Sequence, residues 1–156
     1  MTDDKATKPG NFDMPDGNYG GDLSSSETWQ LLRDEPAALL VDVRTQVEWQ
    51  LIGKPDLSEL DKEPFYLQWV TMNGLNESFE DELLAGLQER GVCESDPVIF
   101  MCQSGGRSKM AAMQLAAKGF TRSYNYSEGF EGDMDEHRHR NSVNGWKASG
   151  LPWYQT

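Results

Sequence analysis

A cysteine stands at the junction between a predicted buried strand and a predicted helix. The apolar, β-prone residues 98–101 end at Cys102, a Gly-rich turn follows, and residues 109–118 form a helical pattern that stops at Gly119. At such a junction the free backbone N–H groups of the first helical turn and the positive end of the helix dipole point at whatever occupies the turn. This environment favours thiolate over thiol and also binds anions. The sequence therefore predicts a nucleophilic sulfur held in an anion cradle.

The position of the arginine after the cysteine separates two kinds of chemistry. Protein phosphatases and related arsenate reductases use a Cys-x5-Arg ring that holds a tetrahedral oxyanion above the sulfur. Here the sixth position after Cys102 is Ser108, and the arginine comes one residue earlier, at Arg107. The shorter ring fits around the sulfur, or around a second sulfur bonded to it, better than around a phosphate. The spacing favours sulfur transfer, and phosphoryl or arsenate chemistry stays as a disfavoured alternative.

Strand-like and helix-like patterns alternate along the rest of the chain. Strands are predicted at residues 37–43, 64–70, 98–101 and 120–126. Helices are predicted after the capping box Ser24-x-x-Glu27, after Thr45, over residues 77–90, after the cysteine turn and over residues 142–149. This alternation is typical of a parallel α/β sheet with helices on both faces. In such sheets ligands bind beyond the carboxyl ends of the strands, where Cys102 and the triplet Asp42–Arg44 both fall.

The composition limits the class of protein. The 156 residues suit one domain, which we expect over residues 23–156, preceded by a polar and disordered tail at residues 1–22. The net charge of −12 argues against binding to nucleic acid or to an acidic membrane. The two cysteines make no disulfide framework, and the N-terminus does not resemble a signal peptide. We therefore expect a cytoplasmic protein, monomeric by default.

Three segments resemble the signatures of the rhodanese-like sulfurtransferases. Residues 102–108 are similar to that family's active-site loop, commonly Cys-x-Ser-Gly-x-Arg-Ser; residues 40–49 resemble its first signature and residues 145–152 its closing one. The resemblance covers roughly residues 23–153. It implies a single rhodanese domain, with a five-stranded parallel sheet flanked by helices and a cysteine persulfide as covalent intermediate. The chain departs from the family at residues 50–57 and at the longer segment 131–143, and both segments are expected near the mouth of the site or at its rim.

The resulting mechanistic hypothesis is a double displacement. The Cys102 thiolate attacks the outer sulfur of a donor such as thiosulfate, and a small thiol, cyanide or a protein acceptor then removes that sulfur from the persulfide. Arg107 supplies a permanent cation for the anionic donor and for the thiolate. No cofactor or metal is expected. The persulfide is held by the backbone N–H groups of the loop, namely those of Gln103, Ser104, Gly105, Gly106, Arg107 and Ser108, with both glycines in conformations that a Cβ would disfavour.

Two further groups of residues allow more than one interpretation. In one interpretation, Asp42 accepts hydrogen bonds from the cysteine loop, and Arg44 either pairs with Glu48 or faces the donor. In the other, Asp42 and Arg44 form a structural ion pair. Residues 136–140 carry two histidines and two arginines and read as a solvated loop, a cationic rim or, weakly, a metal site.

The persulfide itself also allows two functions. The protein is either an enzyme with rapid turnover or a carrier or sensor that passes sulfur to a specific protein partner. Its acidic surface and loose N-terminal tail would suit such docking.

Overall fold

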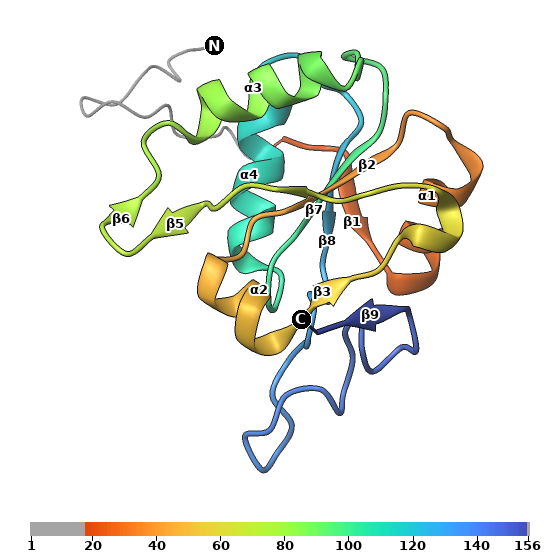
Figure 1. Ribbon diagram of the computed structural model, residues 1–156, viewed down its shortest axis with the longest axis vertical. Coiled ribbons are helices and arrows are strands. Elements are labelled where there is room, and N and C mark those ends of the chain that lie inside the picture. The colour runs from red at the N-terminus through yellow and green to blue at the C-terminus, as the bar shows by residue number, and fades with distance from the viewer. Residues whose placement is uncertain (1–17, 156) are drawn as a thin grey trace.

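The computed structural model describes residues 18–155 and contains a five-stranded parallel sheet (Figure 1). The strand order is β1-β8-β7-β2-β4, and every pair in this sheet is parallel. The strands are β1 (Gly21–Leu23), β2 (Leu39–Asp42), β4 (Phe65–Tyr66), β7 (Val98–Met101) and β8 (Ser123–Tyr126). The predicted architecture is confirmed. Of the tail predicted to be disordered over residues 1–22, residues 1–17 lie outside the described residues.

The central strands alternate their side chains between two apolar clusters. Val41, Phe100 and Cys102 face the cluster that contains α3 (Phe79–Glu89) and α4 (Gly106–Ala116). Leu40 and Ile99 face the opposite cluster, which contains Leu32 of α1 (Ser25–Asp34) and Trp146 of the C-terminal segment. Both faces of the middle strands are therefore covered, which explains why their sequences read as continuous apolar runs.

Short elements surround the carboxyl end of the sheet. The helix α2 (Gln46–Ile52) follows β2, and β3 (Lys54–Pro55) pairs antiparallel with β9 (Trp153–Tyr154). A single 3-10 turn, Ser58–Leu60, precedes β4, and the hairpin of β5 (Val70–Thr71) and β6 (Gly74–Leu75) precedes α3. Figure 1 shows α2, β3 and β9 gathered at one end of the molecule, with α3 at the other. The cysteine therefore lies at the end that carries the connecting loops.

Two helix starts follow the predicted capping chemistry. Ser24 accepts a hydrogen bond from the Glu27 backbone N–H, and the Glu27 side chain accepts one from the Ser24 backbone N–H, at the start of α1. Thr45 and Glu48 make the same reciprocal pair at the start of α2. These boxes satisfy backbone donors that a helix leaves free, and they confirm both predicted starts.

Three sequence-based boundaries were wrong. The ordered domain begins before Leu23, because Gly21–Leu23 form the edge strand β1 beside β8. The predicted strand at residues 64–70 pairs with β2 only at Phe65–Tyr66. Residues 142–149 form turns and bends rather than a helix, because Gly145 has φ 113° and ends any regular helical geometry there.

The carboxylate of Glu128 joins segments that are distant in sequence. It accepts hydrogen bonds from the backbone N–H of Ser25 (3.0 Å), from the Ser25 hydroxyl (2.9 Å) and from the backbone N–H of Gly145 (3.0 Å). The start of α1, the segment after β8 and the C-terminal turns are thereby held together. Within residues 18–155, no helix is long and apolar enough to span a bilayer.

Replacing Trp146 with alanine should lower the free energy of unfolding by about 3–5 kcal/mol, because its large side chain is fully buried. It packs edge-on against Tyr126 and Trp29, and its indole N–H donates to the carbonyl of Pro152 at 2.6 Å. The control Trp153→Ala, at a residue that is 40% exposed, should cost about 1 kcal/mol or less. Urea unfolding followed by circular dichroism measures both, and equal losses would contradict the assignment of Trp146 to the core.

Candidate active site

The sulfur of Cys102 takes the place of a helix cap. Helix α4 begins after Gly105 and has no side-chain cap of its own. Instead, the backbone N–H groups of Gly105 (3.1 Å) and Ser108 (3.4 Å) both donate to Cys102 Sγ. Ser108 is the third residue of the helix, the position whose N–H an N-cap side chain ordinarily binds. The free donors and the dipole of α4 therefore stabilise negative charge on the sulfur.

The loop presents this sulfur through two of its amides. The N–H groups of Gly105 and Ser108 reach Sγ, whereas the prediction placed all six amides from Gln103 to Ser108 around it. The loop is fixed from behind by the segment after β8, because Phe130 N–H donates to the Cys102 carbonyl (2.8 Å) and Glu131 N–H to the Gln103 carbonyl (3.2 Å).

The two glycines of the turn have different roles. Gly105 has φ 103°, and a Cβ at this position would overlap the backbone carbonyl of Ser127. Gly106 is the first residue of α4, has no positive φ, and a Cβ there would meet nothing within 4 Å. Both glycines were expected to adopt conformations that a Cβ would disfavour. This expectation is correct for Gly105 and wrong for Gly106.

The hydroxyl of Ser108 links the sulfur to Asn125, a residue that the sequence analysis missed. Ser108 Oγ lies 3.3 Å from Cys102 Sγ and donates to Asn125 Oδ1 at 2.6 Å. The Asn125 amide is oriented by donating to Asp22 Oδ1 (3.1 Å) and to the Gly105 carbonyl (3.3 Å). The one available signal is an asparagine among the buried residues of β8, where unpaired polar groups are costly.

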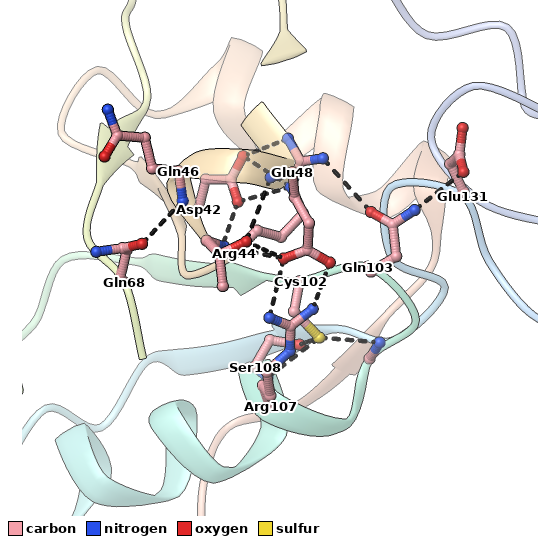
Figure 2. Close-up of polar contacts among 12 residues, drawn as sticks. Asp42, Arg44, Gln46, Glu48, Gln68, Cys102, Gln103, Arg107, Ser108 and Glu131 are labelled. Carbon is pink, nitrogen blue, oxygen red and sulfur yellow. Dashed lines mark hydrogen bonds and ion pairs between the residues drawn. The ribbon is translucent and has the colours of Figure 1, made fainter. Parts of the chain in front are cut away.

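Arg107 forms a two-pronged ion pair with Glu48, as Figure 2 shows beside Cys102. Both of its terminal nitrogens donate to the Glu48 carboxylate at 3.0 Å. Burial opposes both charges, but the Glu48 contact raises the pKa of Arg107 above its ordinary value. Burial likewise opposes ionisation of Glu48, but Arg107 and the Thr45 backbone hold the pKa of that carboxyl below its usual value. Glu48 thus caps α2 and fixes Arg107 with the same carboxylate.

Arg44 binds Asp42 rather than Glu48, and the side chains of Arg44 and Asp42 are fully buried. Its guanidinium donates to Asp42 at 2.8 and 3.0 Å and to the Gly53 carbonyl at 2.8 Å. It also lies over the Phe130 ring, 4.1 Å from the centroid, and reaches Gln103 Oε1 at 3.4 Å. Of the two interpretations left open by the sequence, the structure contains the structural ion pair of Asp42 and Arg44, and the alternative in which Arg44 pairs with Glu48 or faces the donor was wrong. The hydrogen bonds of the Asp42 carboxylate go to Arg44, which in turn contacts Gln103 of the cysteine loop.

A third ion pair closes the other side of the loop. Gln103 Nε2 donates to Glu131 Oε1 at 3.0 Å, and Lys147 Nζ binds Glu131 Oε2 at 2.8 Å. The side chains of Lys147 and Glu131 are 9% and 20% exposed. Neither residue was predicted as part of the site, because Glu131 begins the irregular segment 131–143 and Lys147 lies in a segment that was expected to form a short helix. Ser104 belongs to the turn, but among residues 18–155 the hydrogen-bonding partners of the sulfur are Gly105 and Ser108.

The segment 131–143 is organised by one carboxylate. Asp135 accepts hydrogen bonds from the backbone N–H groups of His137 (2.8 Å) and His139 (2.9 Å) and from the Ser142 hydroxyl (2.7 Å). Both histidine side chains remain on an exposed loop. In the part of the chain that the structure describes, no group of three or more His, Cys, Asp and Glu side chains is placed to hold a metal ion.

Comparison with known proteins gives a consistent relationship. The model of the family described as the STR4 middle domain matches residues 20–156. The chain is 38% identical to the uncharacterized protein RP600 of Rickettsia prowazekii over 132 residues, which covers 84% of this chain and 94% of that protein. It is 28% identical to the thiosulfate sulfurtransferase GlpE of Actinobacillus pleuropneumoniae, covering 84% of this chain and 90% of GlpE.

A solved structure supports the same relationship. The crystal structure of Rv0390 from M. tuberculosis superposes with a TM-score of 0.75 at 43% sequence identity, covering 89% of this chain and 100% of that one. This chain and Rv0390 therefore share the same fold.

Gly105→Ala should destabilise the protein by more than about 2 kcal/mol, because it combines a positive φ with overlap at the Ser127 carbonyl. Gly106→Ala should be neutral or stabilise by up to about 1 kcal/mol, because alanine favours a helix more than glycine does. Thermal unfolding compares the two variants directly. Equal effects at both positions would contradict the geometry assigned to the turn.

Asp42→Ala should lower the free energy of unfolding by about 3–5 kcal/mol, because it leaves the fully buried guanidinium of Arg44 without its partner. Asp34→Ala removes the partner of Arg33 in an exposed ion pair and should cost less than about 0.5 kcal/mol. Denaturant titration of both variants provides the measurement. A small loss for Asp42→Ala would mean that Arg44 can reach solvent.

Proposed function

Because the chain belongs to the STR4 middle-domain family of rhodanese-like proteins, we propose that it is a sulfurtransferase that carries a sulfane sulfur as a persulfide on Cys102. The observation that carries this proposal is the capping of α4 by Cys102 Sγ, with two backbone N–H groups directed at the sulfur. A sulfur in that position is stabilised as an anion, which is the form that attacks a sulfane donor.

The reaction has two displacement steps. The Cys102 thiolate attacks the outer sulfur of a donor R–S–S⁻ or of thiosulfate; a new S–S bond forms, the donor's S–S bond breaks, and R–S⁻ or sulfite leaves. An acceptor thiolate or cyanide then attacks the outer sulfur of the persulfide, takes that atom and releases the Cys102 thiolate. Each step exchanges one bond for another, so no external oxidant or reductant is needed.

The parts of the loop have separate roles in these steps. The amides of Gly105 and Ser108 hold the inner sulfur, and the Ser108 hydroxyl lies beside it. Glu48, Asp42 and Arg44 act as positioning residues, because they hold Arg107 and Gln103 without touching the sulfur. The engagement of Arg107 by Glu48 also argues against phosphatase chemistry, in which an arginine would have to be available to a bound oxyanion.

Exposure of the purified protein to thiosulfate or methanethiosulfonate should add one sulfur atom to Cys102, and dithiothreitol should remove it. Intact mass spectrometry measures the gain, and peptide mapping assigns it. Cys102→Ser should abolish both the mass gain and the formation of thiocyanate from cyanide. Cys93→Ser, which removes the exposed second cysteine, should retain both.

The outcome of the same assay distinguishes the alternatives. Sulfur loading followed by rapid cyanide turnover supports the enzyme, whereas loading without turnover indicates a persulfide carrier. Failure of every sulfane donor to load Cys102, together with hydrolysis of a phosphate ester, would overturn the proposal.

A further inference from the structure

We infer that Cys102 is built to receive sulfur from an organic sulfane donor with no more than one negative charge, such as an alkyl persulfide or a thiosulfonate, rather than from the thiosulfate dianion. This inference rests on the proposed function and specifies its donor. It follows from how the charged side chains around the cysteine loop are paired.

The cation nearest the sulfur is neutralised in place. Arg107 lies close enough to Cys102 for the two groups to interact electrostatically, and its two terminal nitrogens are both directed at the Glu48 carboxylate. Glu48 is itself fixed by the backbone N–H and hydroxyl of Thr45, at 2.9 and 3.1 Å. Arg107 therefore cannot turn to a donor without leaving a half-buried carboxylate unpaired, which is costly.

Two further cations near the loop, Arg44 and Lys147, are also paired with carboxylates. Arg44 is buried against Asp42, and Lys147 binds Glu131, whose second oxygen accepts from Gln103. The ammonium of Lys109, which follows the loop, lies over the Tyr19 ring, 6.0 Å from its centroid. Among residues 18–155, each of the two guanidinium groups that contact the cysteine loop has a carboxylate partner.

The adjacent segment adds no positive field. Residues 131–143 contain four carboxylates and two arginines, so the segment that could have formed a cationic rim has an excess of negative charge. The whole chain has a net charge of −12. A dianion approaching Cys102 therefore loses hydration near a negatively charged segment and finds Arg44, Arg107 and Lys147 already bound to carboxylates, whereas a donor with one or no charge loses much less.

The two donor classes undergo the same chemistry at Cys102. With methanethiosulfonate the thiolate attacks the terminal sulfur, the sulfur–sulfur bond breaks, and methanesulfinate leaves with the bonding pair. With thiosulfate the identical attack releases sulfite. The two donors differ by a methyl group in place of one charged oxygen, so their comparison isolates the charge of the donor.

The test measures second-order rates of sulfur loading on Cys102 from thiosulfate and from methanethiosulfonate, each divided by its rate with a free small-molecule thiol. After this correction the unsubstituted protein should load at least tenfold faster from methanethiosulfonate. Glu48→Gln should raise the thiosulfate-to-methanethiosulfonate ratio about tenfold, because it frees the charge of Arg107 while glutamine still completes the capping box. Adding Arg107→Gln to that variant should remove the gain.

Glu89→Gln is the matched control, because it changes the net charge equally at an exposed position on α3, near the opposite end of the sheet (Figure 1). It should leave the donor ratio within about twofold of the unsubstituted protein. A corrected preference for thiosulfate, or a ratio that Glu48→Gln does not move while circular dichroism shows the fold intact, would overturn the inference alone. Loading by neither donor would overturn the proposed function and the inference with it.

Discussion

The structure depends on one contact between a side chain and a helix end: the sulfur of Cys102 accepts the hydrogen bonds that would otherwise need a capping residue at the start of α4. Most helices meet this need with serine, threonine or aspartate close to their first residue. Here the acceptor comes from the end of the preceding strand, so the same contact caps the helix and directs two backbone N–H groups at the sulfur proposed to carry the persulfide. The parallel order of β7 and β8, the left-handed conformation of Gly105 and the packing of residues 127–131 behind the loop all serve to hold that geometry.

The charges around this sulfur are arranged to position groups rather than to attract anions. Three cations near the loop each have a dedicated carboxylate, and two of those carboxylates also make a second contact, since Glu48 caps α2 and Glu131 holds Gln103. Each ion pair fixes the positions of its two side chains and adds no net charge to the site, because the carboxylate accepts the hydrogen bonds that the cation donates. The anion stabilisation available to the substrate then comes mainly from backbone dipoles, which carry no formal charge and act over a short range.

The sequence was sufficient for those features that depend on local pattern. Continuous apolar runs identified β2 and β7, and the two capping boxes located the starts of α1 and α2. The strand, cysteine and Gly-rich turn located Cys102 and the loop that begins α4. The ion-pair partners were not predictable in the same way, because Arg44 could reach Asp42 or Glu48 until the path of α2 was fixed. The contacts of Asn125 with Ser108 and of Glu131 with Gln103 were not predicted, because they join strands and loops that meet only in the folded chain. β1 was missed because a strand of three residues carries too little pattern.

The link from Asn125 to Asp22 gives the first strand an importance beyond its length. β1 is the outermost strand on its side of the sheet, and Asp22 on it orients the amide that receives the Ser108 hydroxyl. A shortened chain that starts at Leu23 would lose this orientation, and it would also leave the N–H and C=O groups of β8 free along an open edge. Such an edge is a template for adding a strand from another molecule. Self-association and a less ordered cysteine loop would then both follow from the loss of the first two residues of β1, Gly21 and Asp22.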